Sequence, residues 1–527
     1  MPDAITDRYD AIIVGAGHKG LVSAGYLAGA GLSVLVLERR DVVGGSCVTE
    51  ELFPGVRVST CSYICHLLQR RVVDDLELVR HGLRVHTVDP YRFQPFPDGQ
   101  YMLTWQDARQ TQEEVARIDA ADGKNYPNWY AFWRRAAGIL HRHFLEDPPT
   151  LGQLFAECEG TDDEPVLRRM LTGNMVDLVT EHFRSPYVRA TFLDAQDAGD
   201  PRAPGSILAE AYNMMDVLTE PSLLGIPHGG MGAITQAMAR SAEARGAVIR
   251  TGVEADRIVV EGGRAPRATG VALADGTVIE ARLVLSNADP KRTFGTLVAE
   301  GDRPKGYVEG IERMGTRAGY LKFHCVLSEL PDFSRYLGER PELGERALAQ
   351  VRLNPSIAYF EKAWSQASSG VPADEPVMHM QIPTVYDDSL VAADGVSAGR
   401  HVASVWGLYA PVRPNGASWD DLRQGVGERL IDTINSYAPN FRNSVVEWDL
   451  YTPGDLQERM YLTDGNIRHL DMVAGQMFAD RLSYDTPIAG LYLCGAGTHP
   501  GGEVTGAPGH NAAKAVLRAL DASEWAR

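Results

Sequence analysis

The chain has 527 residues, of which 44% are hydrophobic and 23% are charged. This composition is typical of a soluble globular protein. The length exceeds what a single hydrophobic core usually supports, so we expect two domains that are interleaved in sequence. The formal net charge of −18 argues against an extended contact with nucleic acid or with an anionic membrane surface.

The cysteine spacing and the apolar runs exclude further classes of protein. Six cysteines occur and none belongs to a CxxC pair; Cys61 and Cys65 have a spacing typical neither of a redox dithiol nor of a zinc site. The first residues carry no hydrophobic signal segment, and no apolar run reaches the ~18 residues of a membrane span. We therefore expect reduced thiols, no metal centre and a cytoplasmic protein.

The opening stretch, residues 9–45, is the strongest signal in the sequence. Apolar runs at residues 11–14 and 34–37 flank a glycine turn and a helical pattern, and the second run ends on a carboxylate. The turn has the spacing G-x-G-x-x-G, which allows a sharp turn, a close approach of a pyrophosphate and tight packing of the helix on the sheet. The pyrophosphate then lies at a helix N-terminus, where free N–H groups favour negative charge.

This pattern predicts a dinucleotide site. The carboxylate follows the last glycine at close to the ~20-residue distance expected of a ribose ligand. Two further glycines just past the acid favour a flavin nucleotide over a nicotinamide. The predicted cofactor-binding residues in this stretch are Gly15, Gly17, Gly20, Glu38, Gly44 and Gly45.

Residues 107–218 have mainly helical periodicity, and the segment 129–145 is its most distinctive part. On a helix, its large apolar side chains share one face, while its arginines and histidines lie on the other. Two interpretations stay open. The helix either faces the core with a solvated basic side, or rests on lipid headgroups and admits an apolar substrate.

Two later stretches return to the nucleotide-binding pattern. Strand-like pieces between residues 248 and 286 follow a helix that ends near Ala244, and the backbone at Val253 is placed to meet an adenine. Residues 491–493 form a short strand that runs into a glycine-rich loop and then into a helix from about Gly509. In this closing loop, Glu503, His499 and His510 are candidates to tune the cofactor or to accept a proton.

Four blocks of the chain together resemble a known family. They are VGAGHKGLVSAGYLAGAGLSVLVLERRDVVGG near the start, PHGGMGAITQAMA in the middle, SNADP at 286–290 and LYLCGAGTHPGGEVTGAPGHNA near the end. In this order they resemble the phytoene desaturase (carotenoid desaturase and isomerase) branch of the FAD-dependent amine oxidase superfamily. Within it they are similar to a subgroup named after a pyridine nucleotide-disulfide oxidoreductase domain. The sequence does not support the word disulfide, because it has no redox CxxC and a single dinucleotide fingerprint.

The resemblance implies an α/β fold with a doubly wound, Rossmann-type FAD domain built from discontinuous segments and an α+β substrate domain. We place the FAD domain at residues 1–83, 225–295 and 465–527, and the substrate domain at residues 84–224 and 296–464. The resemblance also implies that the FAD lies beside a set of residues near the C-terminus, namely Gly495, Gly497, Gly502 and Glu503.

The leading functional hypothesis is an FAD-dependent oxidoreductase that desaturates an apolar substrate, with isoprenoids as one class, by hydride transfer to flavin N5. Oxygen or a quinone would be the electron acceptor. A flavin-dependent double-bond isomerase, a flavoprotein with mainly a binding or assembly role, and an amine oxidase stay open as alternatives. We expect no nucleic acid partner. Peripheral membrane contact through residues 129–145 and a homo-oligomer are compatible with the sequence.

Overall fold

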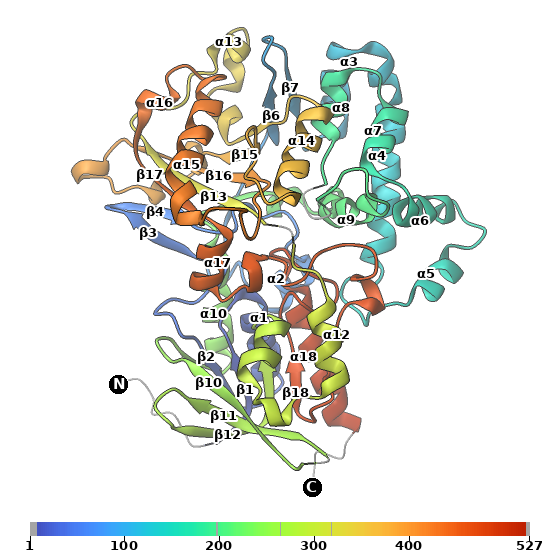
Figure 1. Cartoon of the computed structure of the whole chain (residues 1–527), viewed down its shortest axis with the longest axis vertical. Helices are drawn as coiled ribbons and strands as arrows, with labels where there is room; N and C mark the ends of the chain where they lie inside the picture. The colour runs from blue at the N-terminus through green and yellow to red at the C-terminus, as the bar shows by residue number, and fades with distance from the viewer. Residues whose placement is uncertain (1–7, 196–198, 264, 318, 523–527) are drawn as a thin grey trace.

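The computed structural model describes residues 8–195, 199–263, 265–317 and 319–522. Two seven-stranded sheets organise it. Figure 1 shows an elongated molecule with the first sheet and both chain ends in the lower part, and the second sheet with a broad layer of helices in the upper part. The fold is therefore a mixed α/β fold with two main sheets, as the α/β prediction expected.

The first sheet is formed by strands from three separate stretches of the chain. Its order is β10-β11-β12-β1-β2-β9, and β18 pairs with the second half of β12. The strands β9, β2, β1, β12 and β18 run parallel, while β10 and β11 extend β12 as antiparallel neighbours. The bounds are β1 (Arg8–Val14), β2 (Val34–Leu37), β9 (Val248–Arg250), β10 (Ala255–Glu261), β11 (Arg267–Leu273), β12 (Val278–Ser286) and β18 (Leu491–Leu493).

Helices cover both faces of this sheet, which explains why its central strands are continuous apolar runs. Because successive side chains of a strand point to opposite faces, Ile13 packs into one core and Ile12 into the other. One face carries α1 (His18–Gly29), α10 (Gly232–Ala244) and α18 (Ala507–Ala522), and the other carries α12 (Lys305–Arg313).

The second sheet has the order β17-β13-β16-β15-β14-β6-β7. Neighbours are antiparallel except β14 and β6, which are parallel. β13, which lies between the edge strand β17 and β16, is buried along its whole length. The bounds are β6 (Arg92–Pro95), β7 (Tyr101–Thr104), β13 (Leu321–Leu327), β14 (Gln350–Leu353), β15 (Val377–Gln381), β16 (His401–Leu408) and β17 (Val445–Tyr451).

Most of the helices belong to the upper part of the molecule (Figure 1). A helical layer packs into one large core with residues of β16, and α15 packs on a second core at the sheet. The bounds are α3 (Ala108–Ile118), α4 (Ala120–His141), α5 (Leu151–Cys158), α6 (Asp163–Thr172), α7 (Met175–His182), α8 (Pro186–Phe192), α9 (Ser206–Asn213), α14 (Ile357–Ser368) and α15 (Trp419–Asn435). Shorter helices are α2 (Arg70–Asp75), α11 (Pro290–Arg292), α13 (Ser334–Leu337), α16 (Phe441–Ser444) and α17 (Pro453–Met460).

The aromatic face of α4 lies inside the protein. Trp129 and Trp133 are 3% and 1% exposed and pack in the helical core. The basic side instead meets acidic residues, since Arg135 pairs with Asp162 at 2.7 Å. This burial favours the core-facing interpretation of residues 129–145, because the tryptophans are not available to lipid headgroups. No helix among the described residues combines the length and apolarity that crossing a bilayer requires.

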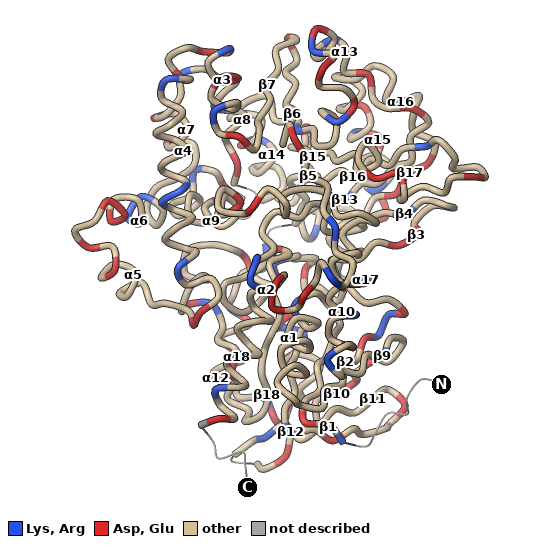
Figure 2. Tube along the Cα trace, turned by 180° about the vertical axis from the view of Figure 1, so that it is seen from behind, with Lys and Arg blue, Asp and Glu red and all other residues tan. Residues whose placement is uncertain are grey.

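Two short ribbons lie between the sheets. One pairs β3 (Thr49–Phe53) with β4 (Val56–Ser59), and the other pairs β5 (Val85–Thr87) with β8 (Gly225–Pro227). The second ribbon joins the place where the chain leaves the predicted FAD domain to the place where it returns. The predicted domain boundaries themselves stay a prediction. Figure 2 shows basic and acidic residues interspersed along the described chain in both the upper and lower parts.

Candidate functional site

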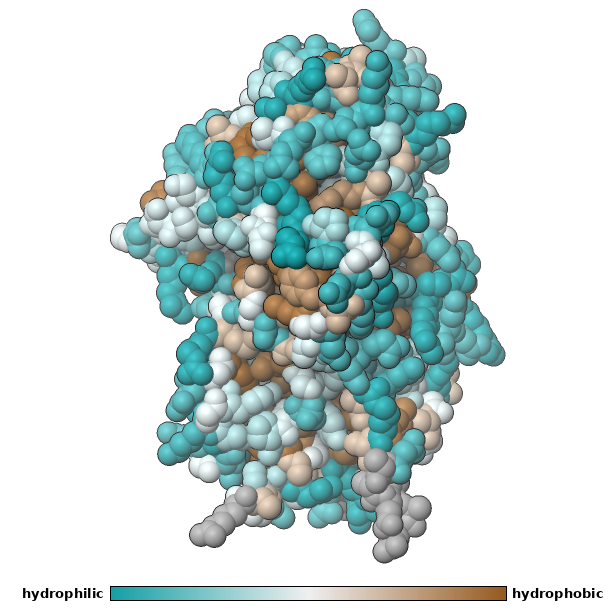
Figure 3. Space-filling view, turned by 90° about the vertical axis from the view of Figure 1, so that its right-hand side faces the viewer, coloured by the Kyte–Doolittle hydropathy of each residue, from teal (hydrophilic) through white to brown (hydrophobic). Residues whose placement is uncertain are grey.

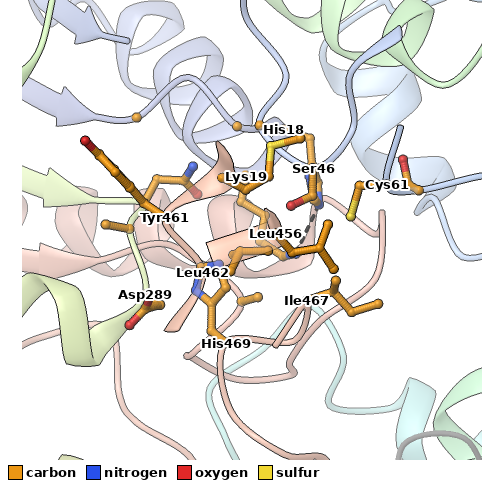
Figure 4. A pocket seen from close by; sticks show the side chains of 18 of the residues that line it. His18, Lys19, Ser46, Cys61, Asp289, Leu456, Tyr461, Leu462, Ile467 and His469 are labelled. Atoms are coloured by element: carbon orange, nitrogen blue, oxygen red, sulfur yellow. Dashed lines mark hydrogen bonds between the residues drawn. The ribbon is translucent and has the colours of Figure 1, made fainter. Parts of the chain in front are cut away.

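A deep cavity lies between the ends of the parallel strands of the first sheet and the second sheet. Its empty space, counted out into the solvent at its open mouth, is about 1570 Å³. Its wall includes Val14 and Leu37 at the ends of β1 and β2, and Lys322 and Trp406 of the second sheet. Figure 4 shows side chains from the N-terminal turn (His18, Lys19) and from the C-terminal segment (Leu456, Leu462, Ile467) at the same space.

The predicted glycine turn forms one end of this cavity. Gly15 and Gly17 line it, and Gly15 has a φ of 96°, which favours glycine. A Cβ on Gly17 would lie 2.6 Å from Nδ2 of Asn287, and a Cβ on Gly20 would lie 2.4 Å from the carbonyl oxygen of Gly15. The turn thus leaves no space for side chains and brings the bare backbone to the cavity wall.

The N-terminus of α1 faces the same end of the cavity. Its N-cap residue, Gly17, provides no side-chain hydrogen bond, and the first turn contains no acidic residue. The N–H groups of a first helical turn have no partner within the helix, so they favour an anion. Lys19 lines the cavity beside them, and burial lowers its pKa to about 7 although the carboxylate of Glu503 opposes this shift. These features fit the pyrophosphate of a dinucleotide.

Glu38 directly follows β2 and is buried at the cavity wall. Its carboxylate accepts the N–H of Ala16 at 2.9 Å and the N–H of Arg40 at 3.0 Å. These bonds fix the side chain across the ends of two adjacent parallel strands. Each carboxylate oxygen retains acceptor capacity, which is the chemistry that a ribose hydroxyl requires.

The other predicted cofactor residues take three kinds of position. Gly45 lines the cavity, and Gly44 donates its N–H to the carbonyl of Ala16 at 2.9 Å, which supports the turn from behind. Val253 does not line the cavity, whereas its neighbours Glu254 and Ala255 do. Among the predicted C-terminal residues, Glu503 lines the cavity. Gly495, Gly497 and Gly502 do not line the cavity, but each is next in the chain to a residue that does.

These three glycines allow close packing of the C-terminal loop. A Cβ on Gly497 would lie 2.3 Å from Pro290, and a Cβ on Gly502 would lie 2.3 Å from the side chain of Arg468. They therefore shape the wall, and Ala496 and Val504 are the residues beside them that reach the cavity.

The far end of the cavity is lined by aromatic side chains around a lysine. Tyr63 and Tyr320 contact the ring of Trp406 with centroid distances of 5.6 Å and 5.0 Å. Lys322, on β13, donates to Oγ of Ser404 at 3.1 Å, and its burial lowers its pKa to about 8. A lysine in this state exchanges its proton near neutral pH.

Glu503 occupies a strained position in the cavity wall. Its φ of 60° lies in the left-handed region, which costs a residue with a side chain of the order of 1 kcal/mol. The carboxylate forms an ion pair with the buried guanidinium of Arg468. Burial raises the pKa of Glu503, but Arg468 and His66 outweigh that effect and hold it well below the usual range. These partners favour the charged carboxylate of Glu503, and its predicted role, to tune the cofactor or to accept a proton, stays a prediction.

His66 stands between two carboxylates. Its Nε2 lies 3.7 Å from Oε2 of Glu503, and its Nδ1 lies 4.0 Å from Oδ2 of Asp216. Asp216 also accepts the hydroxyl of Tyr91 at 3.3 Å. The imidazole lines the cavity, so a ligand can reach it where it stands between the two carboxylates.

The other two predicted catalytic residues do not reach the cavity. His499 is 4% exposed and its Nε2 contacts the carbonyl of His143 at 2.9 Å. His510 is fully buried in α18, where its Nδ1 contacts Oδ1 of Asn511 at 2.7 Å. Neither histidine is among the residues that line the cavity, and a catalytic role for them stays a prediction.

Several residues of the site belong to no sequence motif and were not predicted. His66 follows a stretch of turn residues, and Arg468 lies in an irregular segment. Lys322 could have been noticed, because it interrupts an apolar run, LKFHCVL, that forms a wholly buried strand. The six cysteines are all buried and unpaired, as predicted.

We expect Glu503→Gln to lower the free energy of unfolding by roughly 3 kcal/mol at neutral pH, because it removes the charge beside a buried guanidinium. The pKa of Glu503 falls on folding, so this contribution is fully present above the ~4.3 of an unfolded glutamate. It is lost as the pH falls further toward the folded pKa. Denaturant titrations at several pH values measure the difference between the wild type and the variant.

The matched control is Glu342→Gln, which removes an exposed partner of Arg340 and should leave the free energy of unfolding nearly unchanged at every pH, because solvent screens this pair. A stability difference for Glu503→Gln that stays unchanged in acid would contradict the assignment of the ionised pair.

Comparisons with known proteins agree with this geometry. The family model of flavin-containing amine oxidoreductases matches residues 20–316. Pyridine nucleotide-disulfide oxidoreductase domain-containing protein 2 of Mus musculus is 32% identical, over 97% of this chain and 94% of that protein. A limonene dehydrogenase chain of Castellaniella defragrans is 27% identical, over 98% and 96%. A neurosporene-forming phytoene desaturase of Cereibacter sphaeroides is 23% identical, over 96% and 94%.

Solved structures share the fold. An oxidoreductase from Methanosarcina mazei superimposes with a TM-score of 0.62 at 16% identity, over 96% of this chain and 99% of that one. A redesigned putrescine oxidase gives 0.58 at 15% identity, over 98% and 99%. The chain belongs to the flavin-containing amine oxidoreductase family and is a flavin-dependent oxidoreductase of the amine oxidase and carotenoid desaturase type.

Proposed function

We propose that this protein dehydrogenates a neutral, apolar substrate with FAD as cofactor. A hydride leaves one carbon and a proton leaves its neighbour, so that a carbon–carbon double bond forms. The observation that carries the proposal is the far end of the cavity, where aromatic side chains lie in the same cavity as an imidazole between two carboxylates.

The FAD site follows from the glycine turn. The pyrophosphate would be held by the backbone at Gly15 and Gly17 and by the N-terminus of α1, and a ribose by Glu38. When bound, FAD supplies hydride acceptance. Lys19 and the helix N-terminus place positive charge at this part of the cavity, which favours the anionic cofactor.

We assign to His66 the role of accepting the proton that leaves the substrate. A general base must be able to take up a proton near the working pH. The carboxylate of Glu503 does not meet this requirement, because its partners hold its pKa well below the usual range. Glu503 and Asp216 instead stabilise the imidazolium that forms when His66 takes the proton. Tyr91 holds Asp216 from the other side and so helps to orient this group.

The part of the cavity wall around Lys322 favours a hydrocarbon over a protonated amine as substrate. Its side chains include those of Tyr63, Trp406 and Ile467, and the positive charges of Lys322 and Arg468 would repel a cation. The lining carboxylate Glu503 forms an ion pair with Arg468.

Anaerobic mixing of the purified holoprotein with chosen compounds tests the proposal. Limonene and phytoene serve as hydrocarbon probes, because relatives named for them cover nearly the whole chain, and putrescine serves as the amine probe. We expect the absorbance of oxidised flavin to bleach with a hydrocarbon and not with the amine. Oxygen or a soluble quinone is then added to separate samples of the reduced protein. The compound that restores the absorbance of oxidised flavin is the electron acceptor.

Other results would redirect the assignment. A rearranged hydrocarbon without net bleaching would favour the isomerase. Bleaching with putrescine alone would favour an amine oxidase, and no reaction with a broad panel of hydrocarbons and amines would favour a binding role.

A further inference from the structure

A second cluster of chemically reactive side chains lies outside the flavin cavity, at the ribbon that joins the two sheets. It consists of His86, His228 and Asp387, and one ligand atom of each lies within 4.8 Å of the others. We propose that this cluster binds a divalent transition-metal ion of the zinc class. The sequence suggested no metal site, because the three residues are far apart in the chain and have no spacing typical of one.

The two histidines are brought together by the pairing of β5 with β8. His86 is opposite Ile226 in this antiparallel ribbon, and His228 follows two residues later, so the two are diagonal neighbours on one face. His228 also donates its N–H to the carbonyl of Arg84 at 3.0 Å, which continues the ribbon past β8. Nε2 of His86 then lies 3.5 Å from Nδ1 of His228.

Asp387 reaches the same point from the connection between β15 and β16 of the second sheet. Its side chain is fully buried, and Oδ1 lies 3.1 Å from Nδ1 of His228. The carboxylate is held rigidly, because it accepts the N–H of Gly229 at 2.6 Å and the hydroxyl of Ser389 at 2.6 Å. A fixed carboxylate beside two imidazoles is a preorganised ligand set.

Two of the three separations between ligand atoms are close to those around a small metal ion. Zinc binds nitrogen and carboxylate oxygen at about 2.0–2.2 Å, so two ligands of a tetrahedral site stand about 3.3 Å apart. The observed 3.5 Å and 3.1 Å bracket this value. In contrast, 3.5 Å is long for a hydrogen bond between two imidazoles. The side chain of His228 is half exposed, so an ion can enter and water can complete its coordination.

Such an ion would connect three segments at the junction of the two sheets. The segment from His228 leads directly into α10, whose first N–H groups bind Thr49 and Ser59 of the β3–β4 ribbon. The proposed ion is therefore structural and independent of the flavin reaction. It would stabilise the folded protein by RT ln(1 + c/Kd), where c is the ion concentration, so the midpoint of thermal unfolding would rise with the logarithm of c above the dissociation constant.

Calorimetric titration of chelator-treated, FAD-loaded protein with Zn²⁺ tests the site. We expect one ion per chain and a higher thermal midpoint. Loss of a single ligand should weaken binding at least about 100-fold, since even outer partners of metal sites are worth about 10–100-fold. His86→Ala and His228→Ala are the test variants, and His141→Ala, an exposed histidine on α4, is the matched control.

Asp387 is left unchanged, because it also anchors the loop at Gly229 and its loss would disturb the fold. A second measurement avoids variants altogether: Zn²⁺ should protect His86 and His228, and not His141, from an imidazole-modifying reagent, as mapped by mass spectrometry. No saturable binding to the wild type, or binding that survives in both histidine variants, would overturn the proposal.

Discussion

Gly17→Val should yield a protein that folds but retains no FAD through purification. The valine Cβ would stand 2.6 Å from Nδ2 of Asn287, and its methyl groups would occupy the space in which the pyrophosphate meets the first turn of α1. Overpacking of this kind costs about 1–3 kcal/mol, and the lost anion contacts add to it, so we expect the affinity for FAD to fall at least about 100-fold. Flavin absorbance per chain, followed by reconstitution titrations, measures the loss.

Gly29→Ala is the control for this prediction. It adds a methyl group to the same helix at the exposed end, where the nearest neighbour is the flexible side chain of Arg245 at 3.3 Å. That variant should bind FAD as the wild type does. If Gly17→Val kept its full flavin content, the cofactor site would have to lie elsewhere.

His66→Gln should slow flavin reduction by a hydrocarbon substrate by about 10²–10³-fold while leaving the FAD content unchanged. General acid–base catalysis contributes about 10²–10⁴-fold, and glutamine keeps the size and polarity of the side chain without its proton chemistry. The inflection in the pH profile of the reduction rate that belongs to the base should disappear. Anaerobic stopped-flow absorbance, with the substrate found by the mixing experiment, gives both quantities.

Two further variants separate catalysis from positioning. Asp216→Asn keeps the contact with Tyr91 but removes one of the charges that stabilise the imidazolium, so it should slow reduction less than His66→Gln and retain the inflection. His141→Gln, on the surface of α4, should have no effect. Unchanged rates in His66→Gln would assign the proton to another group, and Lys322 would then be the first to test.

Much of the first sheet could be predicted from the sequence. The strands at 34–37, 248–250 and 491–493 and the helix end at Ala244 coincide with the observed bounds. The strand at 34–37 is a short apolar run that is buried along its whole length, and such a run can be recognised in the sequence without knowledge of its partner strands. The closing helix begins at Ala507, slightly before the predicted start.

The second sheet and the far end of the cavity could not be predicted in the same way. The strands of that sheet are separated by long irregular connections, and their order depends on pairing between distant segments, such as β6 with β14. His66 and Arg468 become neighbours of Glu503 only after the C-terminal loop has folded against the N-terminal segment. A single charged residue produces no periodic pattern in the sequence. The contacts of His66 and Arg468 with Glu503 therefore become visible only in the folded structure.

The cavity is assembled from segments that are far apart in the chain. Its lining residues come from both sheets and from many separate stretches of the sequence. Figure 3 shows that apolar residues are also exposed in the middle of one face of the molecule. A fold assembled in this manner depends on long-range contacts, which form slowly compared with helical turns.

The wall contributed by the C-terminal loop has a consequence for biosynthesis. The glycine turn lies near residue 17, whereas Arg468, Glu503 and the strand β18 lie in the last part of the described chain. A ribosome-bound chain that has been made only as far as β2 would therefore contain the glycine turn but not the opposite wall of the cavity. The complete cavity wall requires both ends of the described chain to be present and folded together.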